Sequence, residues 1–495
     1  MTDAAPHIDW PRTHVHFIAI GGIGMSALAR IARAQGATVS GCDCAESTIL
    51  DELRSLGCTC SVGHSAAHLR GVDLVVHSSA VPADNPERHA ALTLNIPDIS
   101  RGRLLAWLQQ DHDTVAISGA HGKTTTTWIA ANLLIRAGAD PTVAVGGVVS
   151  DLGGNARVGK SALFVTEADE SDGSFLYLNP KYPVITNVDA DHLDYYGNMD
   201  AIKDAFVRFT QAAPGGAVIA CADCPNVQAI LPLARSRVVT FGVGHGDIAA
   251  HNVRLEPGRA VYDAALPGGP IRNLVLSLPG IHNVRNSLAA LALAHELDLP
   301  LDAVRDAFAN TSSVGRRLER RGCVRGVTLY DDYAHHPAEI AATLESARML
   351  APRRLVGIFQ PHRYTRTQLL HREFGSVFGR LDLLLIAPIY AASERPIDGV
   401  TSELIAREVQ ARGVPVELLP DLAAVPDRLA GELAPGDTLI TIGAGDVWKA
   451  GDAALARIRA DEDALGGAGI LACPAADKST RSTALAGVQG QADAA

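Results

Sequence analysis

The chain has 495 residues, and 47% of them are hydrophobic and 20% charged, as in soluble globular proteins that hold several cores. Domains of ordinary size contain about 100–200 residues, so this length predicts about three of them. The formal net charge is −11 and no cluster of five or more Lys or Arg occurs, which argues against nucleic-acid binding and means that an anionic substrate needs local cations.

The first predicted unit, residues 1–110, opens with a strand over His14–Ile20, a turn at Ala19–Gly24 and a helix over Met25–Gln35. Strand, glycine turn, helix and next strand are the pattern of a Rossmann-like doubly wound sheet. The turn is a degenerate form of the dinucleotide-binding turn, and Asp43 supplies the acid that an NAD site requires after the second strand. These residues alone leave open an NAD(P)-dependent oxidoreductase, or a tight turn that binds nothing.

The second predicted unit, residues 111–311, begins with a strand over Thr114–Ser118, followed by a glycine-rich loop and a helix over Thr124–Ala137. The loop is a shortened phosphate-binding loop, because Ile117 stands where the full pattern has glycine. In such a loop the backbone N–H groups cradle the β-phosphate, the lysine reaches the β- and γ-phosphates and the following hydroxyl can ligate Mg²⁺. We therefore expect ATP and Mg²⁺ to bind here, at Gly119, Ala120, His121, Gly122, Lys123, Thr124 and Thr125.

Two acidic segments follow apolar strands in the second unit. Glu167–Asp172 comes after Leu163–Thr166, and Asp189–Asp194, which contains His192, comes after Val184–Thr186. Closely spaced carboxylates repel one another unless a cation lies among them, and Mg²⁺ prefers oxygen ligands. The segments therefore indicate a metal site, with a solvated acidic turn and a surface histidine as the alternatives.

The third predicted unit, residues 312–460, again alternates strands and helices, so the whole chain is predicted to be α/β. Asp331–Pro337 and Gln360–Arg366 each follow a strand, where folds of this class bind ligands, although exposed polar turns are an equal alternative. Residues 461–495 are rich in Gly, Ala and Ser and lack apolar periodicity, which predicts a disordered tail.

The remaining signals concern location and metals. No apolar run approaches the roughly 18–20 residues of a membrane span, and Met1–Thr13 lacks the pattern of a secretion signal, so we expect a cytoplasmic protein. The pairs Cys42/Cys44 and Cys58/Cys60 lie in the first predicted unit and Cys221/Cys224 in the second, and no His-x-x-x-His partner accompanies them, so we predict no zinc there. The sequence does not distinguish a monomer from a homodimer.

Taken in order, the motifs resemble the Mur ligase family over about residues 14–455. The most specific stretches are Gly21–Ser26, His121–Thr126, Glu167–Ser174, Asp331–Glu339 and Phe359–Thr367. The resemblance implies three domains: a Rossmann-like domain for the UDP end of the substrate, a central ATPase and a Rossmann-like C-terminal domain.

The resemblance also implies a reaction. The chain is most similar to members that phosphorylate the carboxylate of UDP-N-acetylmuramate with ATP and then let the amine of L-alanine displace the phosphate, in peptidoglycan precursor synthesis. The nearest alternative is a recycling ligase that attaches a murein tripeptide to the same sugar nucleotide, but members of that kind carry Tyr where this chain has Ser171. The oxidoreductase becomes a remote alternative, because it leaves the phosphate loop unexplained.

Family members imply the roles of individual residues. The metal ligands implied are Thr124, Glu167 and His192, and the catalytic residues are Lys123, Glu167, His192 and His336. The remaining contacts to ATP are implied at His282, Asn283, Asn286, Arg317 and Asp332. The UDP-sugar site is implied at Gly21, Gly22, Gly24, Asp43, His64, Ser78 and Ser79, and Arg363 and Arg366 are expected to face the sugar acid and the incoming alanine.

The departures from the family are few. Ala19 and Ala120 stand where members commonly have Gly and Thr, and Cys42 stands where Ser is usual. None of these changes removes an expected phosphate or metal ligand.

Overall fold

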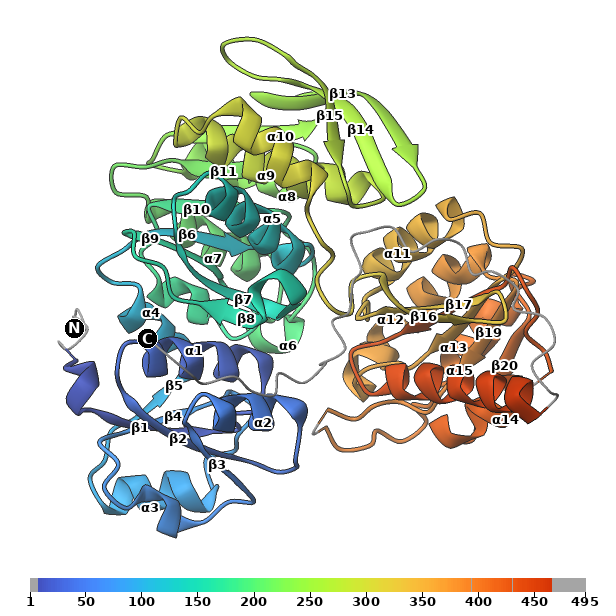
Figure 1. The fold of residues 1–495 in the computed structure, drawn as a ribbon, viewed down its shortest axis with the longest axis horizontal. Coiled ribbons are helices and arrows are strands. Elements are labelled where there is room, and N and C mark those ends of the chain that lie inside the picture. The colour runs from blue at the N-terminus through green and yellow to red at the C-terminus, as the bar shows by residue number, and fades with distance from the viewer. Residues whose placement is uncertain (1–7, 393, 430, 465–495) are drawn as a thin grey trace, which may run out of the picture.

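The computed structural model describes residues 8–392, 394–429 and 431–464. Figure 1 shows three α/β bodies, with the N-terminal and middle domains stacked on each other and the C-terminal domain beside them. The predicted fold class, three α/β domains with largely parallel sheets, is confirmed. In the part of the chain that the structure describes, no helix is long and apolar enough to cross a membrane.

The N-terminal domain has a five-stranded sheet in the order β3-β2-β1-β4-β5, with every neighbouring pair parallel. Since β1 is central, the chain reverses its winding direction next to it, and ligands bind at such a switch point. The elements are β1 (His14–Ile18), α1 (Ile23–Ala34), β2 (Thr38–Asp43), α2 (Thr48–Ser55), β3 (Thr59–Val62), η2 (Ala66–Leu69), β4 (Leu74–His77), α3 (Pro86–Thr93), β5 (Asp98–Ser100) and α4 (Arg101–Leu108).

The middle domain has a ten-stranded sheet in the order β15-β14-β13-β12-β11-β10-β6-β9-β7-β8. Strands β7 to β8 and β13 to β15 pair antiparallel, and the rest pair parallel. The elements are β6 (Asp113–Ser118), α5 (Lys123–Arg136), β7 (Thr142–Val149), β8 (Gly154–Arg157), β9 (Leu163–Glu167), β10 (Tyr182–Ile185), α6 (Leu193–Tyr196), α7 (Met199–Gln211), β11 (Val218–Cys221), α8 (Pro225–Ile230), β12 (Val238–Val243), β13 (Ile248–Glu256), β14 (Arg259–Ala265), β15 (Ile271–Leu276), α9 (Ile281–Glu296) and α10 (Leu301–Ala309).

The C-terminal domain has a six-stranded sheet in the order β16-β17-β21-β18-β19-β20, in which only β16 is antiparallel to its neighbour. The elements are β16 (Glu319–Val324), β17 (Val327–Asp332), α11 (Pro337–Met349), β18 (Leu355–Phe359), α12 (Tyr364–Val377), β19 (Leu383–Ile386), α13 (Glu403–Gln410), β20 (Val416–Leu418), α14 (Val425–Leu429), β21 (Thr438–Ile442) and α15 (Val447–Ala464). Helix α15 includes the first four residues of the predicted tail, and residues 465–495 lie outside the described residues.

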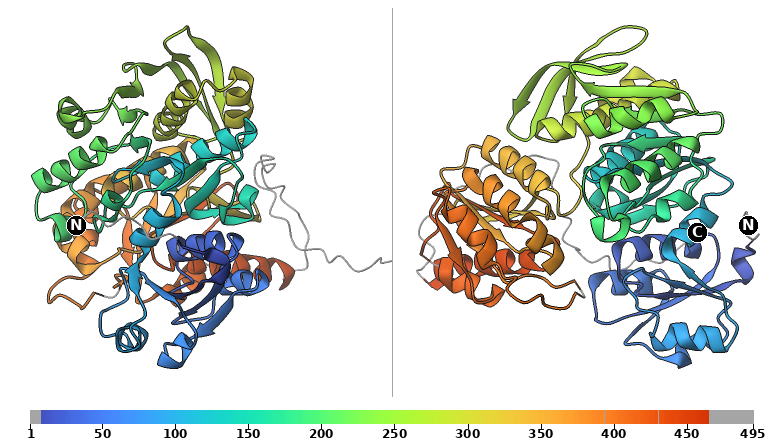
Figure 2. Two further views of the ribbon diagram at one scale, coloured as in Figure 1. Left: turned by 90° about the vertical axis from the view of Figure 1, so that its left-hand side faces the viewer. Right: turned by 180° about the vertical axis from the view of Figure 1, so that it is seen from behind.

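Strands β13 to β15 depart from the alternation of strands and helices in the rest of the middle domain. They form an antiparallel extension at the end of the middle sheet (Figures 1 and 2). The exposed polar residues His251, Asn252, Arg272 and Asn273 interrupt their buried apolar positions, so the apolar signal that marks a buried parallel strand is weak in this segment.

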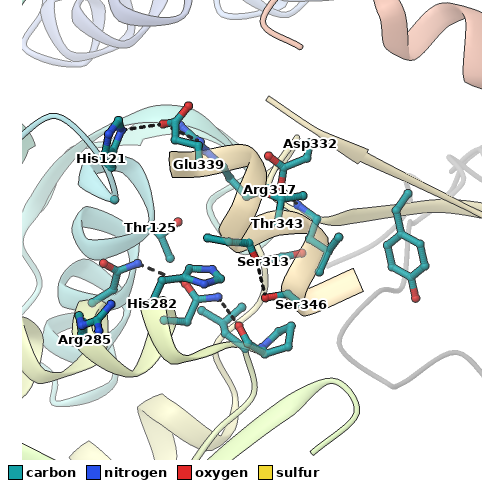
Figure 3. Close-up of a pocket in the computed structure, with 18 of the residues that line it drawn as sticks. His121, Thr125, His282, Arg285, Ser313, Arg317, Asp332, Glu339, Thr343 and Ser346 are labelled. Carbon is teal, nitrogen blue, oxygen red and sulfur yellow. Dashed lines mark hydrogen bonds and ion pairs between the residues drawn. The ribbon is translucent and has the colours of Figure 1, made fainter. Parts of the chain in front are cut away.

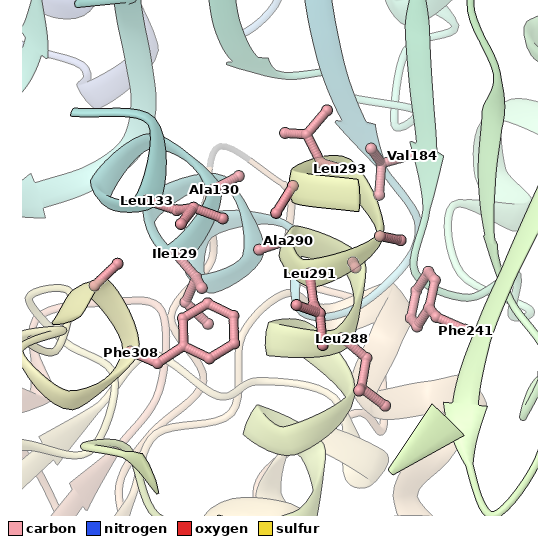
Figure 4. Close-up of a cluster of buried hydrophobic side chains, with 14 of the residues drawn as sticks. Ile129, Ala130, Leu133, Val184, Phe241, Leu288, Ala290, Leu291, Leu293 and Phe308 are labelled. Atoms are coloured by element: carbon pink, nitrogen blue, oxygen red, sulfur yellow. The ribbon is translucent and has the colours of Figure 1, made fainter. Parts of the chain in front are cut away.

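Two cores hold the middle domain. On one face of its sheet, the buried helices α5 and α9 pack together, with Leu288 and Leu291 close to Ile129, Leu133 and Phe308 (Figure 4). On the other face, one continuous apolar cluster contains α7 of the middle domain and α1 of the N-terminal domain. The first two domains are therefore joined by a shared core.

The linker to the C-terminal domain changes its hydrogen-bond partners at one peptide bond. The Trp128 indole donates to Ser312 O at 2.9 Å, and the Gly315 N–H donates to Val148 O at 2.9 Å, so this part is held by the middle domain. The Arg316 side chain then bonds to Asp331 of the C-terminal domain at 2.9 Å.

Replacing Leu288 with Ala should destabilise the middle domain by about 2–5 kcal/mol, because it opens a cavity in a close-packed core. Leu288 has no exposed surface, whereas Leu233 in the same domain is 60% exposed. Leu233→Ala is therefore the matched control, with an expected change under about 0.5 kcal/mol. Denaturant unfolding of both variants measures the difference, and equal losses would contradict the assigned core.

Candidate functional site

Three loops of the middle domain meet at one edge of its sheet. Strand β6 pairs in parallel with β10 on one side and with β9 on the other. The glycine-rich loop follows β6, the first acidic segment follows β9 and the second follows β10. Because the carboxyl ends of parallel strands lie at the same edge, motifs that are far apart in sequence converge there.

The glycine-rich loop turns sharply into α5. Gly119 has φ 131° and Gly122 has φ 83°, conformations that residues with a side chain rarely adopt. A Cβ atom at Gly119 would lie 2.3 Å from the Thr186 hydroxyl, and one at Gly122 would lie 2.7 Å from Asn286 Oδ1. Both the turn and the close approach of neighbouring chains therefore require glycine at these two positions.

Lys123 lies at the first turn of α5 and folds back over the loop. Its ammonium donates to Gly119 O at 2.6 Å and to Glu170 Oε1 at 2.8 Å. Burial opposes its charge, but Glu170 and Asp169 outweigh this effect and raise the pKa of Lys123 above its usual range. A fixed cation therefore lies where a phosphate bound by the loop would need one.

The first acidic segment is built into the protein and is not a solvated turn. Glu170 is buried, and Asp169 pairs with Arg101 of the N-terminal domain at 2.9 Å. Glu167 accepts the Gly146 N–H at 2.7 Å, and a Cβ atom at Gly146 would lie 2.5 Å from both carboxylate oxygens. Burial raises the pKa of Glu167, although Lys123 and the Thr124 hydroxyl oppose the rise.

The second acidic segment brings His192 and Asp191 to the same edge. His192 Nε2 lies 3.8 Å from Glu170 Oε1 and 3.6 Å from Asp191 Oδ2. The C-terminal domain contributes Arg366, whose guanidinium lies 3.6 Å from Asp191 Oδ1. Although burial opposes ionisation of Asp191, His192 and Arg366 hold the pKa of its carboxyl well below the usual range.

His121 of the glycine-rich loop connects the middle and C-terminal domains. Its ring nitrogens lie 3.6 Å from Asp189 Oδ2 and 3.4 Å from Glu339 Oε1, and its ring centroid is 4.8 Å from that of His336. Burial disfavours the imidazolium, but Asp189 and Glu339 together raise the pKa of His121 to about 9. Glu339 also accepts the backbone N–H of His335 at 3.1 Å, which holds it at the start of α11.

A cavity of about 890 Å³ opens beside these residues, between the middle and C-terminal domains. Figure 3 shows His121, Thr125, His282 and Arg317 around it. Burial, with Arg285 and Arg317 nearby, lowers the pKa of His282 to about 4, so its ring is neutral at pH 7. The lining residues of the middle domain include Asn187, His282, Asn283 and Asn286.

Asp332 forms the far wall of this cavity. It accepts the N–H groups of Leu318 at 2.7 Å and Ala334 at 2.8 Å, and burial raises its pKa to about 6. Arg317 lies over the Tyr333 ring at 5.4 Å and near Glu339 at 3.9 Å. Phe241, Leu278, Val314 and Tyr330 also line the cavity, so it combines apolar walls with the cation Arg317 and the acid Asp332, which suits a nucleotide.

The N-terminal domain carries a second glycine-rich turn, at Ala19–Gly24. The Gly21 N–H donates to Asp43 Oδ2 at 2.9 Å, and a Cβ atom at Gly21 would lie 2.7 Å from Leu50 Cδ1. Ala19 has φ 67°, the left-handed conformation that glycine adopts at no steric cost. The loops that carry His64, Ser78 and Ser79 follow β3 and β4, at the same edge of the parallel sheet as this turn.

Around Lys123, the structure brings most of the predicted residues to one edge, but the predicted metal ligands do not form a single cluster there. Among the described residues, the ligand atoms of His121, Asp189 and His336 lie within 4.8 Å of one another, whereas His192 lies next to Glu170 and Asp191. Sequence reasoning gave no role to Glu170, Glu339 or Gly146. Glu170 and Glu339 lie within the sequence motifs described above, whereas Gly146 lies outside any of them.

Three protein-family models match the chain in order. They are "Mur ligase family, catalytic domain" over residues 14–112, "Mur ligase middle domain" over 117–294 and "Mur ligase, glutamate ligase domain" over 316–445. The chain is 45% identical to UDP-N-acetylmuramate–L-alanine ligase of Pelobacter propionicus over 89% of this chain and 96% of that protein. It is 46% identical to the enzyme of the same name from Sorangium cellulosum, over 88% and 94%.

Solved structures agree. The UDP-N-acetylmuramate-alanine ligase of Thermotoga maritima superimposes with a TM-score of 0.79 at 29% identity, covering 90% of this chain and 99% of that one. The murein peptide ligase of Psychrobacter arcticus superimposes with a TM-score of 0.70 at 24% identity, covering 90% and 98%, and so shows a shared fold.

Replacing His121 with Gln should remove a pH-dependent part of the stability. Because the folded pKa of about 9 lies above the ordinary 6.5, protonated His121 stabilises the fold fully below about pH 6.5, and this contribution is lost as the pH rises through 9. A shift of this size corresponds to at most about 3 kcal/mol. Denaturant unfolding across this range should show a steeper fall in the wild type than in His121→Gln, and a parallel fall would contradict the pairing. The exposed His89 gives the control, His89→Gln.

Proposed function

The chain belongs to the Mur ligase family, and we propose that it joins L-alanine to the muramoyl carboxylate of UDP-N-acetylmuramate at the expense of ATP, in peptidoglycan precursor synthesis. One observation supports this most strongly: identity of about 45% with ligases of that name extends through all three domains, covering 96% of the Pelobacter propionicus enzyme. The site shared between the domains also fits this reaction, because its three substrates must meet in one place.

The reaction follows from the chemistry of the carboxylate. A carboxylate resists attack by an amine, because an oxide would have to leave. Transfer of the γ-phosphoryl group of ATP to a carboxylate oxygen gives an acyl phosphate and ADP. The alanine nitrogen then attacks the acyl carbon, phosphate leaves with the C–O electron pair, and the nitrogen loses its proton. Such phosphoryl transfer needs positioning and neutralised charge more than covalent help.

The glycine-rich loop is proposed to hold the phosphates of ATP. Its backbone N–H groups form the cradle and Lys123 supplies the positive charge, exchanging its contact with Glu170 for a phosphate oxygen. His282, Asn283 and Asn286 would lie on the adenine side of the cavity, with Arg317 and Asp332 toward phosphate and ribose.

The residues around Glu167 fit Mg²⁺. The donors are oxygens of a carboxylate and a hydroxyl, Glu167 and Thr124, and the missing side chain at Gly146 leaves room for the carboxylate. His192 is the third ligand that we propose, reaching the ion from the neighbouring loop. When bound, Mg²⁺ would neutralise phosphate charge and align the oxygens of the two reactants.

The C-terminal domain is proposed to hold the incoming alanine. Burial lowers the pKa of His336, which leaves the imidazole neutral at pH 7, and its Nδ1 atom is buried without a hydrogen-bond partner. A neutral imidazole can accept the proton that the alanine nitrogen loses. Arg363 and Arg366 would bind carboxylates through their forked donors.

The first domain is proposed to bind the UDP end of the substrate. Gly21, Gly22 and Gly24 let the pyrophosphate approach the backbone at the start of α1, with Asp43, His64, Ser78 and Ser79 around it. With UDP on this turn, the reacting carboxylate can extend toward the loop at Lys123 in the stacked middle domain. We also propose that the enzyme acts in the cytoplasm, where its nucleotide substrates are available, as a monomer or homodimer.

Amino-acid-dependent formation of ADP tests the proposal directly. With UDP-N-acetylmuramate and ATP present, L-alanine should support turnover, and the murein tripeptide should support much less. Faster turnover with the tripeptide would favour the recycling ligase. Binding of NAD(P)H without binding of UDP-N-acetylmuramate would favour the oxidoreductase.

Lys123→Ala should lower kcat by roughly a hundredfold or more, because it removes a charged donor from the developing phosphoryl transition state. The exposed Lys160 of the same domain gives the matched control, Lys160→Ala, which should retain the wild-type rate. A nearly normal rate in folded Lys123→Ala protein would contradict the role of the loop.

A further inference from the structure

A second cluster of metal-binding side chains lies in the N-terminal domain, outside the site already described. His16 comes from β1, Cys42 from β2, His68 from η2 and Glu87 from α3. One possible ligand atom from each of the four lies within 4.8 Å of the other three. Three of the four residues are buried, and His68 is half-buried, with 24% of its side chain exposed.

Of the three distances from Glu87 to the other ligand atoms, one already matches a tetrahedral zinc site and two are shorter. Ligand atoms on zinc bonds of about 2.0–2.3 Å lie roughly 3.3–3.8 Å apart. His16 Nε2 is 3.7 Å from Glu87 Oε1, while Cys42 Sγ and His68 Nδ1 lie 2.8 Å and 2.6 Å from the same carboxylate. The last two pairs are hydrogen bonds, and they need to lengthen by less than about 1 Å when an ion replaces their protons.

Hydrogen bonding within the protein does not explain the environment of the His16 ring. Its Nε2 atom is fully buried and has no hydrogen-bond partner. Its Nδ1 atom lies 2.9 Å from the Ser40 hydroxyl. When Nδ1 donates to Ser40, Nε2 turns a lone pair into the cluster, which is how histidines that bind metals through one nitrogen are oriented by the other.

Glu87 contacts other members of the cluster through both carboxylate oxygens. Cys42 Sγ donates to Oε2, and His68 Nδ1 lies 2.6 Å from Oε1. The Ser65 N–H also donates to Oε1 at 3.1 Å, which helps to hold the carboxylate in place.

We propose that His16, Cys42, His68 and Glu87 form a structural binding site for Zn²⁺. One sulfur, two imidazole nitrogens and one carboxylate oxygen are a ligand set that suits zinc. On binding, Cys42 loses its thiol proton to solvent and the two imidazoles bind through unprotonated nitrogens, so zinc uptake releases protons. His64 Nδ1, 3.1 Å from Cys42 Sγ, is then placed to donate to the thiolate.

The site would tie four elements together next to the turn that we propose to bind UDP. Cys42 precedes Asp43, which accepts the Gly21 N–H, and His64 lies in the loop that leads into η2, the helix that carries His68. Because His68 is half-buried, the cluster is open to solvent on its side, and an ion can enter there. The site is independent of the proposed ligase reaction, so its test does not depend on activity.

The wild-type protein provides the first test. Purified without chelators from zinc-supplemented culture, it should contain about one equivalent of zinc by elemental analysis. After removal of the metal, titration with Co²⁺ should produce a near-ultraviolet thiolate-to-cobalt charge-transfer band. Cobalt bound by the oxygen and imidazole ligands near Lys123 gives no such band, because no thiolate is among them, and this separates the two sites. Folded wild-type protein that contains no zinc and shows no band would overturn the proposal.

Matched variants locate the ion. Cys42→Ser should abolish the band, and His68→Asn should weaken binding by more than the roughly 10–100-fold that loss of a supporting residue costs. The controls Cys44→Ser and His89→Asn change exposed residues outside the cluster and should behave as wild type. Added Zn²⁺ should raise the thermal midpoint of the wild type but not that of Cys42→Ser. A band that persists in Cys42→Ser would place the ion on other thiols and contradict the assignment.

Discussion

The parallel pairing of β6 with β9 and β10 is the constraint on which the rest of the site depends. It delivers the glycine-rich loop and two acidic segments to one edge, although up to about 70 residues separate them in the chain. The close approach leaves no room for side chains at Gly119, Gly122 and Gly146. The sheet order therefore requires glycine at these positions as much as the proposed binding of phosphate does.

This crowding creates an electrostatic cost that cations from all three domains offset. Bringing the carboxylates of Glu170 and Asp169 close together inside the site costs free energy unless cations pair with them. Lys123 pairs with the first at 2.8 Å and Arg101 with the second at 2.9 Å, and Arg366 lies near Asp191. Since Arg101 and Arg366 come from the flanking domains, charge balance in the middle domain depends on its neighbours.

Local patterns in the sequence predicted the three α/β domains, the phosphate-binding loop and the acidic segments, because each is a short motif next to an apolar strand. Contacts between domains were not predictable in this way: His121 and Glu339 meet across 218 positions, and nothing in either segment specifies the other. The antiparallel strands β13 to β15 were not predicted, because exposed polar residues interrupt their apolar positions. The histidine–cysteine cluster was missed for a third reason, since its ligands come from separate elements without metal-motif spacing.

The linker into the C-terminal domain defines a pivot. Up to Gly315 the chain is bonded to the middle domain, and from Arg316 it is bonded to the C-terminal domain, with positive φ at Arg316 and Leu318. Any rigid-body rotation of the third domain about this linker therefore uses the torsions next to the Gly315–Arg316 peptide bond. Arg317 follows directly and also lines the cavity between the two domains. A rotation of the third domain consequently moves the Arg317 guanidinium as well. A ligand that contacts Arg317 therefore acts on the pivot itself.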